Sequence, residues 1–255
     1  MEKSEVSFSR NIEQEKKDLL QMKLSFKAVE GHEKYLGLPT FVSGSKKRVF
    51  RYIQERVLKK LKGWKEGFLS HAGREVLIKA IAQAIPTYAM QCFRIPVEML
   101  KDIEGMCRRF FWGQKKDERK VAWVGWSKMY KAKKEGGLGM RNLQIFNEAL
   151  LTKQAWRLVK YPDSLMAKTL KNKYFPNTSF MDVKQSPVAS FTWKSILSAR
   201  GLLKKGLRKV VGHGNSVEIW GDPWVPGLPN FRPRKELSHE NSGLRTVCDL
   251  MIQRR

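Results

Sequence analysis

Apolar residues recur at helical spacing along much of this chain. Residues 46–62 are strongly basic except for one apolar stripe, which predicts an amphipathic helix with its cap among Ser43, Gly44 and Ser45. The stripe consists of Val49, Ile53, Val57 and Leu61. Such a helix can bury the stripe against a core and leave its basic side chains in solvent.

The same spacing predicts further helices on both sides of this segment. We expect them at 11–29, at 71–85 up to Pro86, at 97–113 after Pro96, at 143–160, at 163–173 after Pro162, and at 191–206. The apolar face of 97–113 consists of Met99, Ile103, Met106 and Phe110. The fold class predicted is therefore mainly α.

Strand-like segments are few and short. Alternation predicts a short strand within residues 1–10, a strand or extended turn at 34–40, and a short strand or extended loop at 120–130. Residues 207–220 read as a hairpin that turns at 212–215. We expect a glycine-rich turn at 133–140 and, beyond an ordered turn near 220–230, a loose tail.

The charge of the chain points to a polyanionic partner. Fifty Lys and Arg against 24 Asp and Glu give a net charge of +26, a field that favours nucleic acid or an anionic membrane surface. The membrane is disfavoured, because no apolar run approaches the ~20 residues of a membrane-spanning helix. The run at 76–93, for example, is interrupted by Lys79, Gln83 and Pro86. The partner expected is RNA or DNA.

The cysteines and the N-terminal residues indicate an intracellular protein. Cys92, Cys107 and Cys248 are odd in number, far apart and outside any Cys-x-x-Cys pair, which argues against both a disulfide framework and a zinc site. The first residues have no apolar segment after a basic start, so no secretory signal is predicted.

The segment FLSHAGREVLIKA at 68–80 tests whether the chain has an active site. Ser70 and His71 are adjacent, so at a helix start their side chains point about 100° apart and cannot act as nucleophile and base. Ser70 instead suits an N-cap whose hydroxyl accepts from the amide of Ala72 or Gly73. Arg74 has two open interpretations, a phosphate contact at the helix start or an ordinary helix residue.

No other constellation supports catalysis. The aspartates are scattered and never adjacent, whereas two-metal chemistry requires carboxylates that converge on the ions. Gly136–Gly139 lacks the spacing of a nucleotide loop, Asp222 suits the cap of a turn, and His213 stands alone at a predicted turn. We predict no catalytic residue, no metal site and no cofactor.

Cationic and aromatic residues remain as candidates for binding. Residues 46–79 hold eleven cationic and three anionic side chains, enough to follow a phosphate backbone with the polar face of the helices. Trp64 can stack on a base, although packing between two helices is the simpler role. The candidates are Lys46, Lys47, Arg48, Arg51, Lys59, Lys60, Lys62, Trp64 and Arg74.

Several motifs resemble the reverse transcriptase of plant LINE-type (non-LTR) retrotransposons. They are KSEVSFSRN, HEKYLGLPTFVSGSKKRVF, LKGWKEGFLSHAGREVLIKAIAQAIPTYAM, FFWG, WVGWSKMYKAKKEGGLGMRNLQIFNEALLTKQAWRL and IWGDPWVPG. They cover roughly residues 2–230. The part that they resemble follows the catalytic palm motif, so the Asp-Asp motif would lie upstream of Met1 and the zinc-binding segment downstream of Arg255.

The resemblance implies an organisation. Residues 1–44 correspond to the end of the palm and a linker, with Lys3 and Ser4 matching its lysine-serine pair. A basic thumb-like helical domain then spans 45–115, and a helical connector with the hairpin near 208–220 spans 116–230, before a loose tail at 231–255. Met1 is expected to be an internal methionine of the longer reading frame.

The resemblance leaves three functional hypotheses. The first is a non-catalytic remnant that binds RNA or DNA through the basic helices. The second is a thumb-supplying subunit that acts in trans on a separate palm-containing polypeptide, and the third is a basic protein–protein module. We expect an intracellular location, in the nucleus rather than the mitochondrion, and no membrane.

Overall fold

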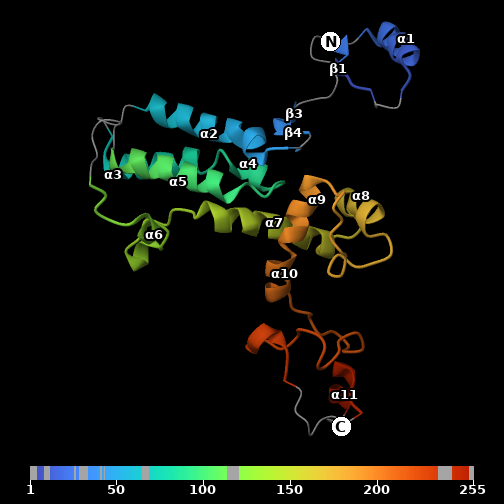
Figure 1. Cartoon of the computed structure of the whole chain (residues 1–255). Helices are drawn as coiled ribbons and strands as arrows, with labels where there is room; N and C mark the ends of the chain where they lie inside the picture. Colours follow the sequence, from blue (N-terminus) through green and yellow to red (C-terminus); the bar gives the residue numbers. More distant parts are fainter. Residues whose placement is uncertain are drawn as a thin grey trace. The chain divides into compact units, whose positions relative to one another are not determined.

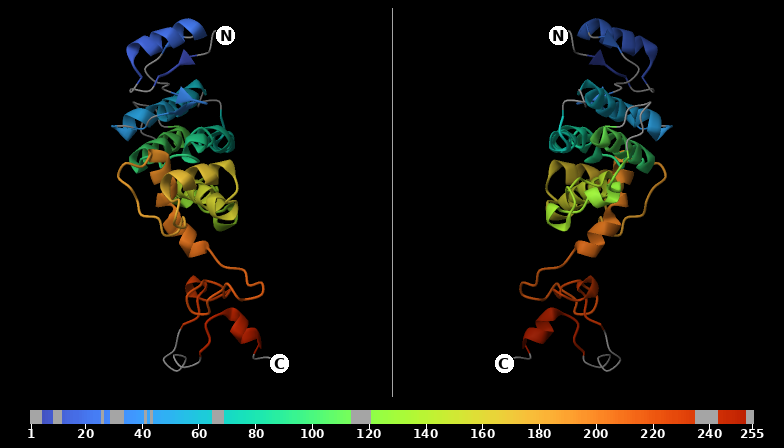
Figure 2. Two further views of the ribbon diagram at one scale, coloured as in Figure 1. Left: turned by 90° about the vertical axis from the view of Figure 1, so that its right-hand side faces the viewer. Right: turned by 90° about the vertical axis from the view of Figure 1, so that its left-hand side faces the viewer.

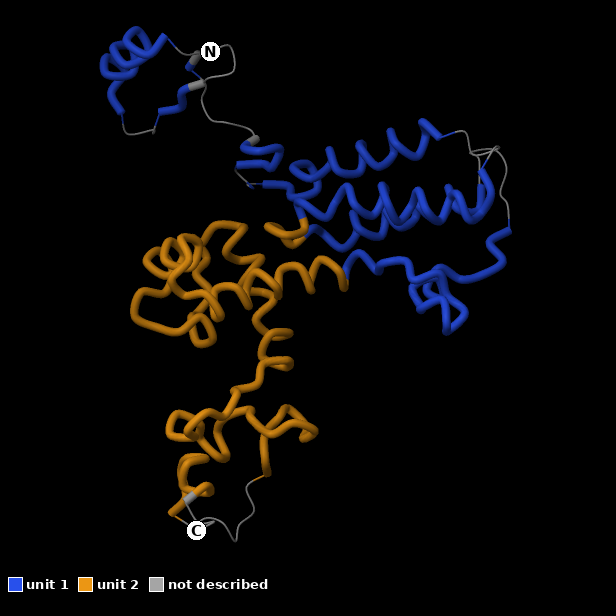
Figure 3. Tube along the Cα trace, turned by 180° about the vertical axis from the view of Figure 1, so that it is seen from behind, with its two compact units in different colours: residues 1–89, 95–144 blue, residues 90–94, 145–255 orange. Residues whose placement is uncertain are grey.

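The chain folds into two compact units (Figure 3). The computed structural model describes residues 5–8, 12–25, 27–28, 34–40, 42, 44–64, 69–113, 121–234 and 243–252. Unit 1 comprises residues 1–89 and 95–144, and unit 2 comprises 90–94 and 145–255. Helices dominate both units, which confirms the mainly α fold. The division at 144 differs from the boundary at 115 expected from the sequence.

Unit 1 begins with short elements. Helix α1 (Gln14–Leu24) lies between strands β1 (Glu5–Val6) and β2 (Lys27–Ala28), which pair in parallel. Strands β3 (Lys34–Tyr35) and β4 (Leu38–Pro39) form an antiparallel hairpin. Its two turn residues, Leu36 and Gly37, both have positive φ, which suits the right-handed twist of a two-residue hairpin. The short strand predicted within residues 1–10 is confirmed. The polar helix is also present, but it ends at Leu24, and Lys27–Ala28 form strand β2 where the helix was predicted to continue to residue 29.

Helices α2 (Lys46–Gly63) and α5 (Val97–Trp112) run side by side and form the centre of unit 1 (Figures 1 and 2). The buried residues of α2 are Phe50, Ile53, Val57 and Leu61. Those of α5 are Met99, Leu100, Ile103, Cys107, Phe110 and Phe111. Val49 and Met106, which the sequence placed on the buried faces, are half-buried. The predicted faces are otherwise correct, but Phe50 replaces Val49 in α2 and Cys107 replaces Met106 in α5, where Leu100 and Phe111 are buried as well.

The helix predicted at 71–85 is broken into two windings. Helix α3 (His71–Leu77) continues into a π-helical turn, η2 (Ile78–Ala82), in which the amide of Gln83 donates to the carbonyl of Ile78 at 2.9 Å. The wider turn keeps both Ile78 and Ala82 fully buried. The short helix α4 (Thr87–Met90) follows Pro86.

Residues 121–140 complete unit 1 without the strand that was one alternative. Helix α6 (Trp126–Met129) and a 3₁₀ turn, η3 (Lys133–Glu135), lead into the predicted glycine-rich turn. A Cβ on Gly137 would lie 2.1 Å from the Lys131 carbonyl oxygen, so only glycine fits. Gly137 is therefore required for backbone packing, whereas Gly136 and Gly139 have positive φ values of +77° and +65°, which favour glycine.

Unit 2 is built on α7 (Leu143–Lys160), α8 (Leu165–Tyr174), α9 (Phe191–Ser198) and α10 (Arg200–Gly206). The helices predicted at 143–160 and 163–173 are confirmed, whereas the one predicted at 191–206 breaks at the buried Ala199. Serine side chains cap α8 and α9, Ser164 accepting from Ala167 N and Ser190 from Trp193 N. The core centres on Trp193, which is 1% exposed.

The hairpin predicted near 208–220 is wrong. These residues pair instead with the chain near 246, where Ile219 N donates to Arg245 O at 3.0 Å and Val247 N donates to Val217 O at 2.9 Å. Glu218 and Thr246 form an isolated antiparallel bridge. The alternation of Val217 and Ile219 indicates an extended segment, but it carries no information about the partner, which lies far along the chain.

The tail predicted at 231–255 is ordered where the structure describes it. The 3₁₀ turn η4 (Pro229–Phe231) precedes it, and helix α11 (Val247–Ile252) lies within it. Val247 joins Val217 and Ile219 in a small second core. Over the described ranges, no helix is both long and apolar enough to cross a membrane.

Candidate nucleic-acid interface

The basic face of α2 lies in solvent. Its buried stripe faces the core of unit 1, so the polar positions between the stripe residues project outward. The candidate side chains that are exposed are Lys46, Lys47, Arg48, Arg51, Lys59, Lys60 and Lys62. Sequence reasoning therefore located the cationic surface, but it did not distinguish between the two flanks of the helix.

One flank of α2 is directed at α5 and is partly neutralised. Lys47 forms an ion pair with Glu98, and Gln54 donates to Asp102 at 3.0 Å. The hydrogen bond and charge of Glu98 raise the pKa of Lys47, and Lys47 in turn lowers the pKa of Glu98. Both side chains are well exposed, so the pair adds little to stability. It nevertheless occupies Lys47, which makes this cation a weaker candidate for a phosphate contact.

The other flank of α2 is hollowed. A depression of ≈ 510 Å³ is lined by Arg56, Lys59, Lys60, Gly63, Trp64 and Ile85. A second one of ≈ 420 Å³ is lined by Gly37, Tyr52, Glu55, Arg56 and Lys59. They share Arg56 and Lys59 and so form one surface along the helix. We call the surface formed by Tyr52, Arg56, Lys59, Lys60 and Trp64 the α2 groove.

Trp64 packs against the core of unit 1 and also lines the α2 groove. It lies immediately after the last residue of α2, half-buried, with its ring 5.4 Å from that of Phe110 and tilted by 55°. The expected packing between two helices is thus confirmed. The same side chain lines the α2 groove, so an aromatic surface held by the core faces the cations.

Two residues of the α2 groove, Tyr52 and Arg56, are absent from the candidates chosen from the sequence. Arg56 counts among the basic residues of 46–79, but composition alone does not separate it from its neighbours. It lines both depressions because it stands three and four positions before Lys59 and Lys60, on the same flank. The helical phase of the cations relative to the buried stripe would have identified it.

Ser70 and Arg74 serve the fold. The hydroxyl of Ser70 accepts from Gly73 N at 3.2 Å, which confirms the predicted N-cap of α3. His71 lies edge-on to Phe111 and Trp112, with centroids 5.5 and 6.0 Å away. Arg74, named as a candidate for phosphate, is half-buried and donates to the carbonyl of Phe111 at 3.0 Å. It joins α3 to the end of α5, so it is not part of the candidate interface.

Replacing Ser70 by alanine is expected to destabilise unit 1 by about 0.5–2 kcal/mol, because Gly73 N loses its acceptor at the start of α3. Urea denaturation measures the change. Ser70→Asp restores an acceptor and should recover most of the loss. An alanine variant as stable as the parent would show that the cap contributes nothing.

Lys79 and Lys133 are also withdrawn from binding. Both pair with Glu75, at 2.7 and 3.2 Å, and Lys79 also donates to the carbonyl of Leu138. The hydrogen bond from Lys79, followed by the smaller effect of Lys133, lowers the pKa of Glu75 below its usual 4.5. These contacts tie α3 and η2 to the segment that follows α6.

The lowered pKa of Glu75 predicts a pH dependence of stability. Its contribution is fully present above pH 4.5 and is lost as the pH falls through the lower pKa of the folded state. We expect Glu75→Gln to be less stable than the parent at neutral pH, by up to ~1 kcal/mol, and the difference to vanish in acid. Urea denaturation at several pH values would contradict this if the difference stayed constant.

Asp222 and His213, which were considered in the sequence, lie at a turn and in a bend of the described chain. Across the described ranges, no three His, Cys, Asp or Glu side chains gather closely enough to hold a metal ion. Asp222 accepts from Glu218 N at 2.8 Å and from Lys209 Nζ at 2.6 Å, which confirms the predicted turn cap. His213 is exposed within a bend.

The chain is similar in sequence to two proteins of Arabidopsis thaliana. No protein-family model matches it. It is 33% identical over 222 residues to the Arabidopsis thaliana protein named "Putative ribonuclease H protein At1g65750", a match of 84% of this chain but 34% of that protein. It is 38% identical over 143 residues to the "Uncharacterized mitochondrial protein AtMg00310" of Arabidopsis thaliana, which is 56% of this chain and 93% of that protein. The chain therefore belongs to the same family as this mitochondrial protein of Arabidopsis.

Proposed function

We propose that the protein is a non-catalytic remnant of a LINE-type reverse transcriptase that binds single-stranded RNA or DNA in the α2 groove. The observation that carries the proposal is the gathering of Arg56, Lys59 and Lys60 beside Trp64 on one flank of α2. Single-strand binding combines two elements: cations that neutralise phosphates, and aromatic rings on which bases stack. Both are present here.

The order of aromatic and cationic residues along the α2 groove favours a single strand. Tyr52 lies one helical turn before Arg56, and Trp64 one turn after Lys60, so the aromatic side chains flank the cations along the helix. Bases reach such rings only when they are unpaired and splayed from the backbone. A duplex would present phosphates alone and would leave both rings unused.

Two further observations support the proposed origin from a LINE-type reverse transcriptase. The motifs quoted above resemble the post-palm part of a LINE-type reverse transcriptase over most of the chain. The chain also spans about a third of a relative whose name mentions ribonuclease H, an arrangement expected if the relatives are pieces of a larger nucleic-acid-processing protein. Under this proposal the chain itself makes and breaks no bonds.

Salt dependence tests the proposal. With three cations on phosphates, the logarithm of the affinity for single-stranded RNA should fall with the logarithm of salt with a slope of about −2 or steeper. Between 50 and 200 mM salt this is a loss of about 20-fold. Fluorescence anisotropy with a labelled oligonucleotide measures it, with the corresponding duplex as control. A change of less than twofold, or tighter binding of the duplex, would contradict the proposal.

Two alternatives give different outcomes. A thumb-supplying subunit would increase primer extension by a separately supplied palm-containing polypeptide in the presence of magnesium, whereas a remnant would not. A protein–protein module would bind the single strand and the duplex equally through charge alone, with no contribution from Tyr52 or Trp64. The location stays a prediction: a fluorescent fusion should mark the nucleus, and accumulation in mitochondria, where the name of one relative places that relative, would overturn it.

A further inference from the structure

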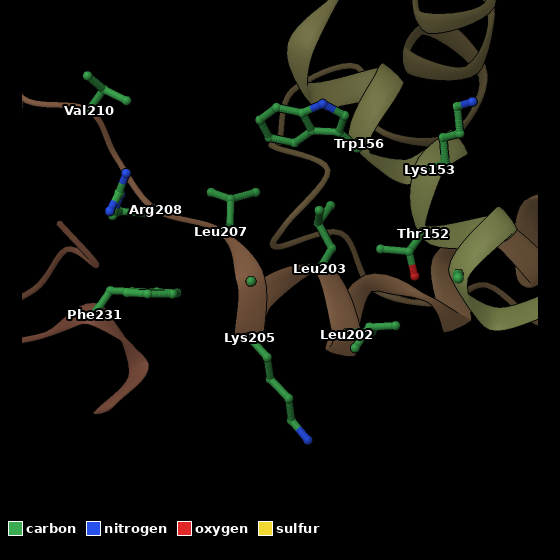
Figure 4. Close-up of a pocket in the computed structure, with 12 residues that line it drawn as sticks. Thr152, Lys153, Trp156, Leu202, Leu203, Lys205, Leu207, Arg208, Val210 and Phe231 are labelled. Carbon is green, nitrogen blue, oxygen red and sulfur yellow. The ribbon is translucent and has the colours of Figure 1, made fainter. Parts of the chain in front are cut away.

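Unit 2 contains an apolar groove that neither its core nor the proposed function explains. Its volume is ≈ 810 Å³, and it runs between α7, α10 and the segment that follows α10 (Figure 4). Its apolar walls include Trp156, Leu202, Leu207, Val210 and Phe231. A groove of this size matches those that accept small ligands or the side chains of a docked peptide.

The walls of this groove expose large apolar side chains to solvent. Trp156 and Leu202 are each 41% exposed and Val210 is 85% exposed. Contiguous exposed apolar side chains of this kind are rare on soluble proteins and mark interaction sites. The groove is therefore a surface that gains from being covered.

Phe231 reaches the groove from a backbone conformation that is unfavourable for a phenylalanine. Its φ is +57°, after Asn230 at +55°, in the left-handed region that bulky residues avoid. Two hydrogen bonds to its carbonyl hold it there, from Trp224 N at 2.7 Å and Val225 N at 2.9 Å. Strain of this kind concentrates at functional positions, and here its consequence is that an aromatic ring closes one side of the groove.

The rim of the groove is cationic. Lys153, Lys205 and Arg208 line it, and no carboxylate does among the described residues. A second copy of this chain is therefore an unsuitable occupant, because a symmetric contact would bring the same cations together. Nucleic acid is also unsuitable, since bases would bury their polar edges against leucine and valine side chains without hydrogen-bonding partners.

We propose that this groove binds an acidic amphipathic helix of a partner protein. Leucine-like side chains at helical spacing would fill the space between Trp156, Leu207 and Phe231, and glutamates beside them would meet Lys153, Lys205 and Arg208. The site lies wholly within unit 2 and is independent of the α2 groove. The chain would thereby join a nucleic acid to an acidic protein partner.

A designed peptide serves as the probe. One labelled peptide carries leucines on one helical face and glutamates elsewhere, and its control carries serines in place of the leucines. The leucine peptide is expected to bind the full chain at least tenfold more tightly by anisotropy, and to gain helical circular dichroism on binding. Equal binding of the two peptides would overturn the proposal, because attraction to a chain of charge +26 would then suffice.

Variants locate the site. Phe231→Asn retains the left-handed turn, since asparagine tolerates positive φ, and removes the ring. This variant should keep the circular dichroism and thermal melt of the parent, and its affinity for the leucine peptide should fall at least tenfold. Trp156→Ala should have the same effect on the affinity. Val188→Ser, at a 92% exposed position that does not line the groove, should change nothing.

Three outcomes would overturn the assignment. The first is undiminished peptide binding in both groove variants. The second is loss of oligonucleotide binding in Phe231→Asn, which would assign the groove to nucleic acid. The third is a parent that sediments as a dimer and a Phe231→Asn variant that sediments as a monomer, which would make a second copy the occupant.

Discussion

Replacing Trp193 by alanine is expected to lower the free energy of unfolding of unit 2 by about 3–5 kcal/mol. The ring is 1% exposed and stacks on Tyr174 and Phe175, at centroid distances of 4.8 and 5.3 Å. Phe180 meets it edge-on at 5.9 Å. Alanine would therefore leave a large cavity and remove several aromatic contacts at once.

Trp193 also takes part in the N-cap of α9 through its backbone amide. Its amide donates to the hydroxyl of Ser190, which also accepts from the hydroxyl of Tyr174 at 2.9 Å. The stack and the cap of α9 thus depend on the same residues. Urea denaturation followed by circular dichroism measures the loss, with Trp123→Ala, at an 82% exposed position, expected to stay within about 0.5 kcal/mol of the parent. A loss below 1 kcal/mol for Trp193→Ala would contradict this core.

Replacing Arg56, Lys59 and Lys60 together by glutamine is expected to weaken single-stranded RNA binding at least tenfold at low salt, about 1.4 kcal/mol. Each neutralised cation removes one phosphate contact and its released counterion. The slope against salt should therefore become shallower by about 2. All three side chains are exposed, so the fold should be unchanged.

The aromatic contribution is separable from the cationic one. Tyr52→Leu retains an apolar side chain on α2 but removes the ring. It should weaken the binding of single-stranded RNA by about 1–3 kcal/mol without altering the dependence of the affinity on salt. Binding of a duplex, which has no free bases, should be unaffected. A change in slope with this variant would show that Tyr52 acts through the cations and not by stacking.

Periodicity predicted the long helices of this fold well, because each buries a continuous apolar stripe. Ile53, Val57 and Leu61 in α2, and Met99 and Ile103 in α5, are buried as expected. The rule placed Val49 one position away from the buried Phe50, since a four-residue repeat drifts relative to the 3.6-residue turn of a real helix. The error is confined to the first turn of the helix, because Ile53, Val57 and Leu61 keep the predicted phase.

Local patterns failed where the partner is distant in sequence. Val217 and Ile219 alternate as a strand should, yet they pair with residues near 246. Gly214, taken as part of a hairpin turn, packs so closely on α11 that a Cβ would lie 2.5 Å from Cys248 N. The fate of Arg74 was equally hidden, because its acceptor at Phe111 lies 37 positions away.

The candidate site was predictable in composition but not in shape. The cations of α2 are evident in the sequence, whereas the groove depends on Gly37, Ile85 and Trp64 meeting one flank of the helix. These residues come from a hairpin, a turn and a helix end. Helical phase alone places Arg56, Lys59 and Lys60 away from Lys47. The tertiary arrangement is needed to show that their flank is hollowed and that Lys47 is ion-paired.

A comparison of two triple variants with equal loss of charge tests the central claim most directly. One carries Arg56→Gln, Lys59→Gln and Lys60→Gln in the α2 groove, and the other Lys171→Gln, Lys184→Gln and Lys204→Gln at exposed positions of unit 2. If the α2 groove binds the strand, the first variant loses at least tenfold in affinity for single-stranded RNA and the second less than threefold. Equal losses in the two variants would show that net charge, and not the groove, attracts nucleic acid.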